Sequence, residues 1–137
     1  MGELGYLDDP GPRFGMLYAQ LTSAAIAALD IGVHLELDVP RGTGWREGER
    51  WNAGIAWELL RAHSSWDERQ LRSELRRCLG LPGQAPSYKL GERIWLKARE
   101  DAMARAGGTF SLKDFHAKAL SLGAMGLDPL REALARV

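Results

Sequence analysis

The strongest constraint on the fold is the spacing of apolar residues, which recur every three to four positions along most of the chain. Such a period places the apolar side chains on one stripe of a helix, whereas a half-buried strand needs strict alternation. Near the N-terminus the period follows Pro12, a residue suited to the first position of a helix. The spacing therefore predicts a helix from about Pro12 to Val33, with a stripe formed by Leu17, Leu21, Ala24, Ala28 and Ile31.

The same period, together with capping and breaking residues, predicts five further helices and no convincing strand. The first two predicted segments are residues 49–62 and a segment that is capped by Ser65 or Asp67 and ends near Gly80. A long segment follows, from residue 88 or just before it to Arg105. The last two begin after Ser111 and after Asp128-Pro129. Residues 36–47 contain Pro40, Gly42 and Gly44 and are predicted to form a loop. The predicted fold class is all-α: one domain over residues 1–137, with about six helices in an irregular bundle.

The charge balance and the single cysteine exclude several classes of protein. Lys plus Arg and Asp plus Glu each total 18, so no net charge attracts the molecule to nucleic acid or to an anionic membrane. The only cysteine, Cys78, cannot form an intramolecular disulfide. The N-terminus lacks a signal-peptide pattern, and no uninterrupted apolar run approaches 18 residues. We therefore expect a cytoplasmic protein with no nucleic-acid partner and no membrane span.

The stretch PGQAPSYKLG, residues 82–91, combines helix breakers with a Tyr-Lys pair at the start of the long predicted helix. Pro82 and Pro86 disfavour helical dihedrals in the residues before them, and Gly83 permits a positive φ. The chain should therefore turn before this helix begins. The helical period places Tyr88 at the N-terminal end of a stripe that we expect to be buried, with Gly91, Trp95, Ala98 and Ala102.

Two interpretations of this stretch remain open from the residues alone. Tyr88 and Lys89 either belong to a binding site or simply begin a helix. Lys89 also starts a column with Arg93 and Lys97 at four-residue spacing, which either is solvated or faces acidic groups.

The first predicted helix carries a polar stripe as well, formed by Gln20, Ser23, Asp30 and His34. Asp30 precedes His34 by four positions, so its carboxylate can bond to the imidazole and orient the ring. A polar stripe on an alanine-rich helix suits a cleft wall, although a plain capping or surface pair is the alternative. We expect structural roles elsewhere: a solvated face for Arg69, Arg72 and Arg76, packing for the five tryptophans, and a core position for Cys78.

Several motifs, in order, make the chain similar to one known family. PGQAPSYKLGERIWLKARE and FSLKDFHAKALSLGAMGLDPLREAL resemble the C-terminal signature of the bacterial family called domain of unknown function 885. LGYLDDPGPRFGMLYAQ and LDIGVHLEL extend the likeness to the whole chain. The chain resembles the last quarter of a full-length member, which implies a helical, gluzincin-type zinc metallopeptidase architecture with an HExxH helix.

The resemblance implies roles for particular residues. His34 and Tyr88 would face the zinc site and bond to an oxyanion or to substrate backbone, as the catalytic pair. The substrate-binding residues would be Asp30, Arg77, Gln84 and Lys89, with Arg77 and Lys89 holding either a substrate carboxylate or a structural acid. The chain itself departs from the family pattern, because it has no HExxH and none of its three histidines is four positions from another. It also has Arg77-Cys78 where the family often has Arg-Tyr.

Three functional hypotheses follow. The first is a C-terminal domain or fragment that supplies the substrate wall of a peptidase-type cleft, holds no cofactor itself, and takes zinc only through an N-terminal metal-bearing half or subunit. The second is a standalone helical module that binds a small anionic ligand, a peptide or a partner protein. The third is a small metal-independent enzyme using Asp30-His34 and Tyr88 for acid–base chemistry. An uncovered helical wall also predicts a homodimer.

Overall fold

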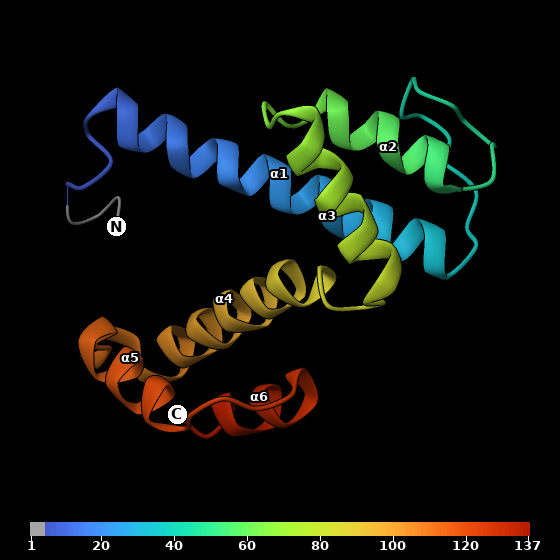
Figure 1. The fold of residues 1–137 in the computed structure, drawn as a ribbon. Coiled ribbons are helices and arrows are strands. Elements are labelled where there is room, and N and C mark those ends of the chain that lie inside the picture. The colour runs from blue at the N-terminus through green and yellow to red at the C-terminus, as the bar shows by residue number, and fades with distance from the viewer. Residues whose placement is uncertain (1–4) are drawn as a thin grey trace. The chain divides into compact units, whose positions relative to one another are not determined.

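The computed structural model describes residues 5–137 and contains six α-helices over this range. They are α1 (Pro10–His34), α2 (Ala53–Ala62), α3 (Glu68–Gly80), α4 (Pro86–Ala106), α5 (Leu112–Ser121) and α6 (Leu127–Leu134), with a short 3₁₀ helix, η2 (Gly107–Thr109), after α4 (Figure 1). Among the described residues, β structure is limited to an isolated bridge between Asp38 and Arg50. The all-α prediction is confirmed. The chain forms two compact units, Met1–Pro86 (unit 1) and Ser87–Val137 (unit 2).

Side-chain caps hold the starts of α1, α2, α3 and α5, and the sequence predicted those of α3 and α5. Asp9 accepts the N–H of Gly11 at 2.7 Å, and Pro10, rather than the predicted Pro12, is at the first position of α1. Asp67, rather than Ser65, caps α3 and forms a reciprocal capping box with Gln70. The hydroxyl of Ser111 accepts the N–H of Asp114 at 3.2 Å at the start of α5. Each cap satisfies an N–H that the first turn of a helix leaves without a partner.

Two predicted helix starts were wrong. The helix expected from Glu49 begins at Ala53, because Glu49 and Trp51 bond to the loop before them: the N–H of Val39 donates to Glu49 at 2.9 Å and that of Trp51 to Leu37 at 2.9 Å. Asn52 then caps α2 through Gly54 and Ile55. The last helix begins at Leu127, with Gly126 as its N-cap instead of Asp128.

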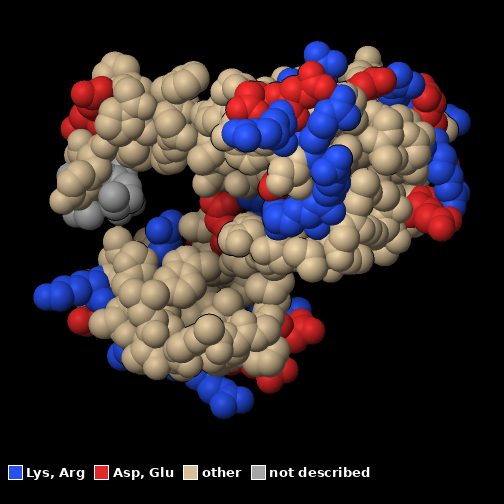
Figure 2. All heavy atoms as spheres, in the orientation of Figure 1, with Lys and Arg blue, Asp and Glu red and all other residues tan. Residues whose placement is uncertain are grey.

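The charged column on α4 and the arginines on α3 differ in their surroundings. Lys89 and Lys97 pair with acids of their own helix, Glu92 at 2.5 Å and Asp101 at 2.6 Å. On α3, Arg69, Arg72 and Arg76 are exposed, as predicted. In the space-filling view, Lys and Arg side chains gather over α3 (Figure 2). Helix α3 carries four arginines and two glutamates, and the glutamates pair with Arg72 and Arg77.

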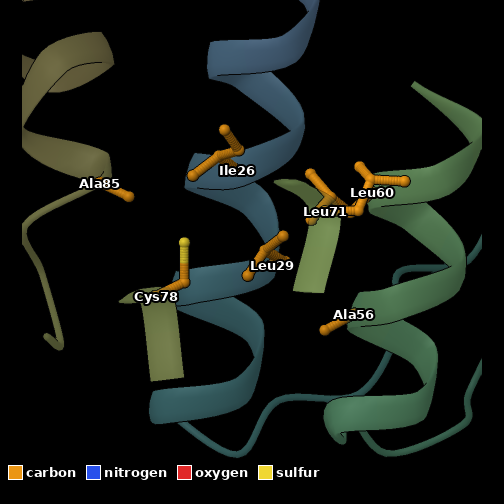
Figure 3. Packing of buried hydrophobic residues seen from close by; sticks show 7 residues of the cluster. All are labelled: Ile26, Leu29, Ala56, Leu60, Leu71, Cys78 and Ala85. Atoms are coloured by element: carbon orange, nitrogen blue, oxygen red, sulfur yellow. The ribbon is translucent and has the colours of Figure 1, made fainter. Parts of the chain in front are cut away.

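Unit 1 has a core formed by α1, α2, α3 and the turn that follows α3. Leu29 and Leu60 are fully buried, and Leu29 points into the space where α2 and α3 meet (Figure 3). Cys78 is also fully buried in this cluster, which confirms its predicted core position. The buried members are Ile26, Leu29, Ala56, Leu60, Leu71, Cys78 and Ala85, with Trp51, Trp57 and Trp66 among the partly buried residues around them.

Unit 2 has a smaller core formed by α4, α5 and α6. Its buried members are Ala102, Phe115, Ala119 and Leu134. Trp95 packs edge-on against Phe115, with ring centroids 5.8 Å apart. Leu127 lies against Gly91, where an added Cβ would be 3.5 Å from its methyl group.

Helix α1 is apolar on more than one face. Its buried side faces the core with Ile26, Leu29 and their neighbours. A second set of apolar residues, here called the α1 stripe, is exposed, with Phe14 at 71%, Leu17 at 53% and Leu21 at 49%, followed by the exposed Ala24 and Ala28. A helix that is apolar all round is normally covered on all sides.

Length and composition alone would allow α1 to cross a membrane. Its most apolar 18-residue window has a mean hydropathy of 1.4, and 39% of this window is buried. The sequence has no uninterrupted apolar run near 18 residues, and the expectation of no membrane span stays a prediction. The central helix of a soluble protein has the same length and hydropathy, so the finding by itself does not distinguish the two environments.

Candidate functional site

The carboxylate of Asp30 is the most constrained polar group in unit 1. Asp30 lies on the core side of α1 and is only 2% exposed. Its Oδ1 accepts the backbone N–H of Gly83 at 3.0 Å, while its buried Oδ2 has no hydrogen-bond partner. A buried carboxylate oxygen without a partner is costly, so such groups are rare away from functional or strained positions. Asp30 therefore marks the junction of α1, α3 and the turn after α3 as the candidate site.

The turn at this junction has the conformation that the sequence predicts. Gly83 has a φ of +80°, which a residue with a side chain rarely adopts. The N–H of Gln84 donates to the carbonyl of Leu81 at 3.2 Å and closes the turn before α4 begins at Pro86. The bond from Gly83 to Asp30 then ties this turn to α1. The predicted turn is confirmed, and Gly83 has the positive φ that was one of the two roles open to it.

His34 contacts α3 rather than Asp30. Its Nε2 lies 3.0 Å from the carbonyl oxygen of Cys78, and because a carbonyl only accepts, Nε2 carries the hydrogen. The predicted Asp30–His34 hydrogen bond does not form, since Oδ1 of Asp30 is taken by Gly83 and Oδ2 has no partner. The acid–base enzyme hypothesis relied on this Asp30–His34 hydrogen bond, which the structure does not contain.

The thiol of Cys78 is unreactive because of its surroundings. Cys78 is fully buried, and burial, with the nearby Glu74 carboxylate, raises the pKa of its thiol to about 11. A thiol with so high a pKa is almost entirely protonated at neutral pH and is a poor nucleophile. The Cys78 side chain thus packs the core, while its carbonyl fixes the His34 ring.

Arg77 and Gln84 belong to the same junction. The guanidinium of Arg77 donates through Nε to Glu74 at 2.9 Å and through a second nitrogen to the other oxygen of the same carboxylate. Its third nitrogen donates to the side-chain oxygen of Gln84. Arg77 therefore pairs with an acid of its own chain, and its role in holding a substrate carboxylate stays a prediction. Gln84 links this ion pair to the turn.

Tyr88 and Lys89 lie in the first turns of α4. Tyr88 is 65% exposed, so the expectation that it lies at the buried end of the α4 stripe was wrong. The stripe is partly buried from Gly91 onward and reaches full burial at Ala102, because α5 and α6 supply the unit 2 core near that end of the helix. The ammonium of Lys89 pairs with Glu92 at 2.5 Å, so Lys89 also holds an acid of its own chain.

Four of the six predicted site residues meet within unit 1. Asp30, His34, Arg77 and Gln84 all bond to groups between residues 74 and 84. Tyr88 and Lys89 lie on the part of α4 that belongs to unit 2. A groove shared by His34 and Tyr88 stays a prediction.

The described residues do not fit a zinc ion. No group of three or more His, Cys, Asp or Glu side chains within residues 5–137 has the arrangement of a metal site. Nδ1 of His63 bonds to the carbonyl of Leu59 at 2.9 Å, and His116 packs against the rings of Trp95 and Phe115. With His34 bonded to Cys78, each histidine has a structural contact.

A second polar cluster, around Tyr18, was missed by the sequence analysis. The phenol oxygen of Tyr18 accepts the N–H of Ser65 at 2.7 Å and lies 3.2 Å from the hydroxyl of Ser64 and 3.0 Å from that of Ser65. The hydrogen bonds to Ser64 and Ser65 lower the pKa of the phenol to about 8. Since the partners are 46 and 47 positions apart, no local sequence pattern indicates the cluster.

The Tyr18 pKa predicts a pH dependence of stability. A phenol whose pKa falls from 10.0 in the unfolded chain to about 8 contributes stability that is complete above pH 10 and is lost as the pH falls through 8. The difference in unfolding free energy between the protein and its Tyr18→Phe variant should therefore grow between pH 8 and 10. Urea unfolding at several pH values measures this slope, and ultraviolet absorbance measures the phenol titration. A pH-independent difference would contradict the prediction.

These observations define an all-helical protein whose junction of α1, α3 and the following turn holds a buried carboxylate and no metal-ligand set among residues 5–137. The chain belongs to the family described as bacterial protein of unknown function, domain of unknown function 885, whose sequence profile matches residues 1–134. No curated protein matches the chain.

Proposed function

We propose that this chain forms the substrate-binding wall of a zinc-peptidase-type cleft whose metal ligands lie outside residues 1–137. The proposal rests on the motifs that place the chain in its family and on the peptidase-type architecture that the resemblance implies. The observation that carries it is the α1 stripe, an uncovered apolar face with exposed residues such as Phe14 and Leu17 on a helix already packed on its other side. Exposed apolar faces of this extent are typical of interfaces.

The metal-bearing partner is proposed to cover the α1 stripe. The stripe carries no charge, and its later positions, Ala24 and Ala28, are small enough for another helix to approach closely. Without the partner, the same stripe favours self-association of this chain as a homodimer. The zinc would supply water activation and charge stabilisation in the assembled cleft.

The residues of this chain have distinct roles in the proposal. Tyr88, exposed at the start of α4, donates its phenol hydrogen to the oxyanion formed during peptide hydrolysis. His34 has Nδ1 available for substrate, because Nε2 bonds to Cys78. In the neutral ring Nδ1 accepts, so His34 binds a substrate backbone N–H rather than the oxyanion. Asp30, Arg77 and Gln84 hold the turn and the end of α3 in place, and Lys89 remains bonded to Glu92.

Reconstitution tests this proposal. The chain is combined with the HExxH-containing segment encoded upstream in frame or in a neighbouring gene, and peptide hydrolysis is followed with a fluorogenic peptide. Tyr88→Phe should lower kcat about 100-fold, the usual effect of removing one oxyanion donor. Tyr6→Phe, which alters another exposed tyrosine, should leave kcat unchanged.

Two results would contradict the proposal. One is sub-micromolar zinc binding by the isolated chain, measured by calorimetry, because the wall alone should lack a metal site. The other is a coding context with no HExxH segment in frame or nearby. The role of the α1 stripe is tested separately: Leu17→Lys with Leu21→Lys should abolish association with the metal-bearing half in size-exclusion chromatography, whereas Leu120→Lys, at a residue that is 72% exposed, should not.

A further inference from the structure

Two exposed arginines from two helices lie over one tryptophan in unit 1, and two further exposed arginines follow on one of these helices. Arg61 lies on α2, and Arg69, Arg72 and Arg76 lie along α3. The guanidinium carbons of Arg61 and Arg72 are 5.9 Å and 5.1 Å from the ring centre of Trp57, within the range of cation–π contacts. These five residues, Trp57 and Arg61 of α2 and Arg69, Arg72 and Arg76 of α3, are called the arginine patch.

The charge of the arginine patch is largely unbalanced within the chain. Glu68 bonds to Arg72 through one carboxylate oxygen, at 2.9 Å and 2.5 Å. Within residues 5–137, Arg69 and Arg76 have no acidic group at ion-pair distance. Like charges three and four positions apart on a helix repel each other. An anion that lies along the helix removes this repulsion.

The shape of the surface is open rather than enclosed. Glu68, Arg69, Arg72, Ser73 and Arg76 line a shallow hollow of about 560 Å³ on one side of α3. The hollow runs from Glu68 and Arg69, in the first turn of α3, to Arg76, about two turns further on. The arginines of the hollow extend over about 10 Å along the helix axis, which is longer than a single phosphate group, and the carboxylate of Glu68 in the lining repels an isolated anion.

We propose that the arginine patch binds an acidic segment of a partner protein. Guanidinium groups bind carboxylates with two parallel hydrogen bonds, and the rings of tryptophan together with arginine are enriched among residues that dominate protein interfaces. Arginines at spacings of three and four match glutamate or aspartate side chains along an acidic helix. The arginine patch is formed by residues other than those of the proposed cleft wall, so the two proposals stand independently.

Binding of a labelled acidic peptide tests the assignment. A helical peptide with glutamates at positions i, i+3 and i+7 is titrated with the full chain at low salt, and fluorescence anisotropy gives the affinity. Arg69→Gln combined with Arg76→Gln should weaken binding roughly tenfold, because each exposed ion pair contributes at most about fivefold. Rising salt should weaken binding to the unaltered chain more than to the double variant.

Matched controls distinguish a specific surface from general electrostatics. Arg105→Gln with Arg136→Gln makes the same change in net charge at two exposed arginines of unit 2 and should leave the affinity unchanged. Circular dichroism confirms that both double variants are folded. Equal losses in the two double variants, or equal binding of a peptide with glutamine at the three positions, would overturn the proposal. Tripolyphosphate binding as tightly as the peptide would overturn the assignment to a protein segment.

Discussion

Replacing Gly32 with alanine is expected to destabilise unit 1 by about 1–3 kcal/mol, the usual range for overpacking a core. A Cβ at this position would lie 2.5–2.6 Å from three ring atoms of Trp51. The ring has little room to retreat, because the N–H of Trp51 bonds to Leu37 at 2.9 Å and that of Leu37 bonds to Gly32 at 3.0 Å. Replacing a glycine inside a helix by alanine normally stabilises a protein by about 0.5–1 kcal/mol. At Gly32 the clash with Trp51 costs more than this gain, so the substitution should be destabilising.

Gly15→Ala is the matched control on the same helix. Gly15 also lies inside α1, but an added Cβ would have nothing within 4 Å. The variant should therefore gain about 0.5–1 kcal/mol from the helix propensity of alanine. Urea unfolding followed by tryptophan fluorescence reports on unit 1, which contains Trp51 and three of the other tryptophans. Effects of the same sign for Gly32→Ala and Gly15→Ala would show that Gly32 does not contact Trp51 closely.

The second large effect is expected for Leu29→Ala, which should cost about 2–5 kcal/mol of unfolding free energy. Leu29 is fully buried in the unit 1 core, and removing most of its side chain leaves a cavity between α1, α2 and α3. The loss combines the transfer of the missing methyl groups with the contacts that their neighbours lose.

Leu21→Ala provides the control for the other face of α1. Leu21 is 49% exposed on the α1 stripe, so its truncation should change the stability of the isolated chain by no more than about 0.5 kcal/mol. Chemical unfolding of both variants at the same protein concentration separates the two faces. A large loss for Leu21→Ala would mean that the α1 stripe is covered in solution, for example in a homodimer.

The presence of each helix was predictable because the residues that start, continue and end a helix are close together in the sequence. Asp67 and Ser111 cap their helices through bonds to residues three positions away, and Gly83 has the positive φ that its place between Pro82 and Pro86 indicates. The start of α2 was mispredicted for the opposite reason. Loop residues 37–39 bond to residues 48, 49 and 51, and a helix-forming period at Glu49 does not reveal those contacts.

The candidate site was predictable only in part. Asp30 and His34 were singled out from their polarity on an alanine-rich helix, and both are held at the junction with α3. Their partners were not predictable, because the N–H of Gly83 and the carbonyl of Cys78 are 53 and 44 positions away in the chain. The role of Arg77 in holding a structural acid follows from Glu74, three positions before it.

The sequence alone determined the helical class, most of the helix ends and the membership of a family. It could do so because periodicity, capping and motif order are properties of neighbouring residues. Only the tertiary structure decided which face of α1 is buried, because both of its faces are apolar and the choice depends on what α2 and α3 present to it. The same holds for Asp30, whose carboxylate bonds to Gly83 rather than to His34, and for Tyr18, whose phenol meets Ser64 and Ser65 across the fold. Contacts between distant segments depend on packing, which a one-dimensional pattern does not contain.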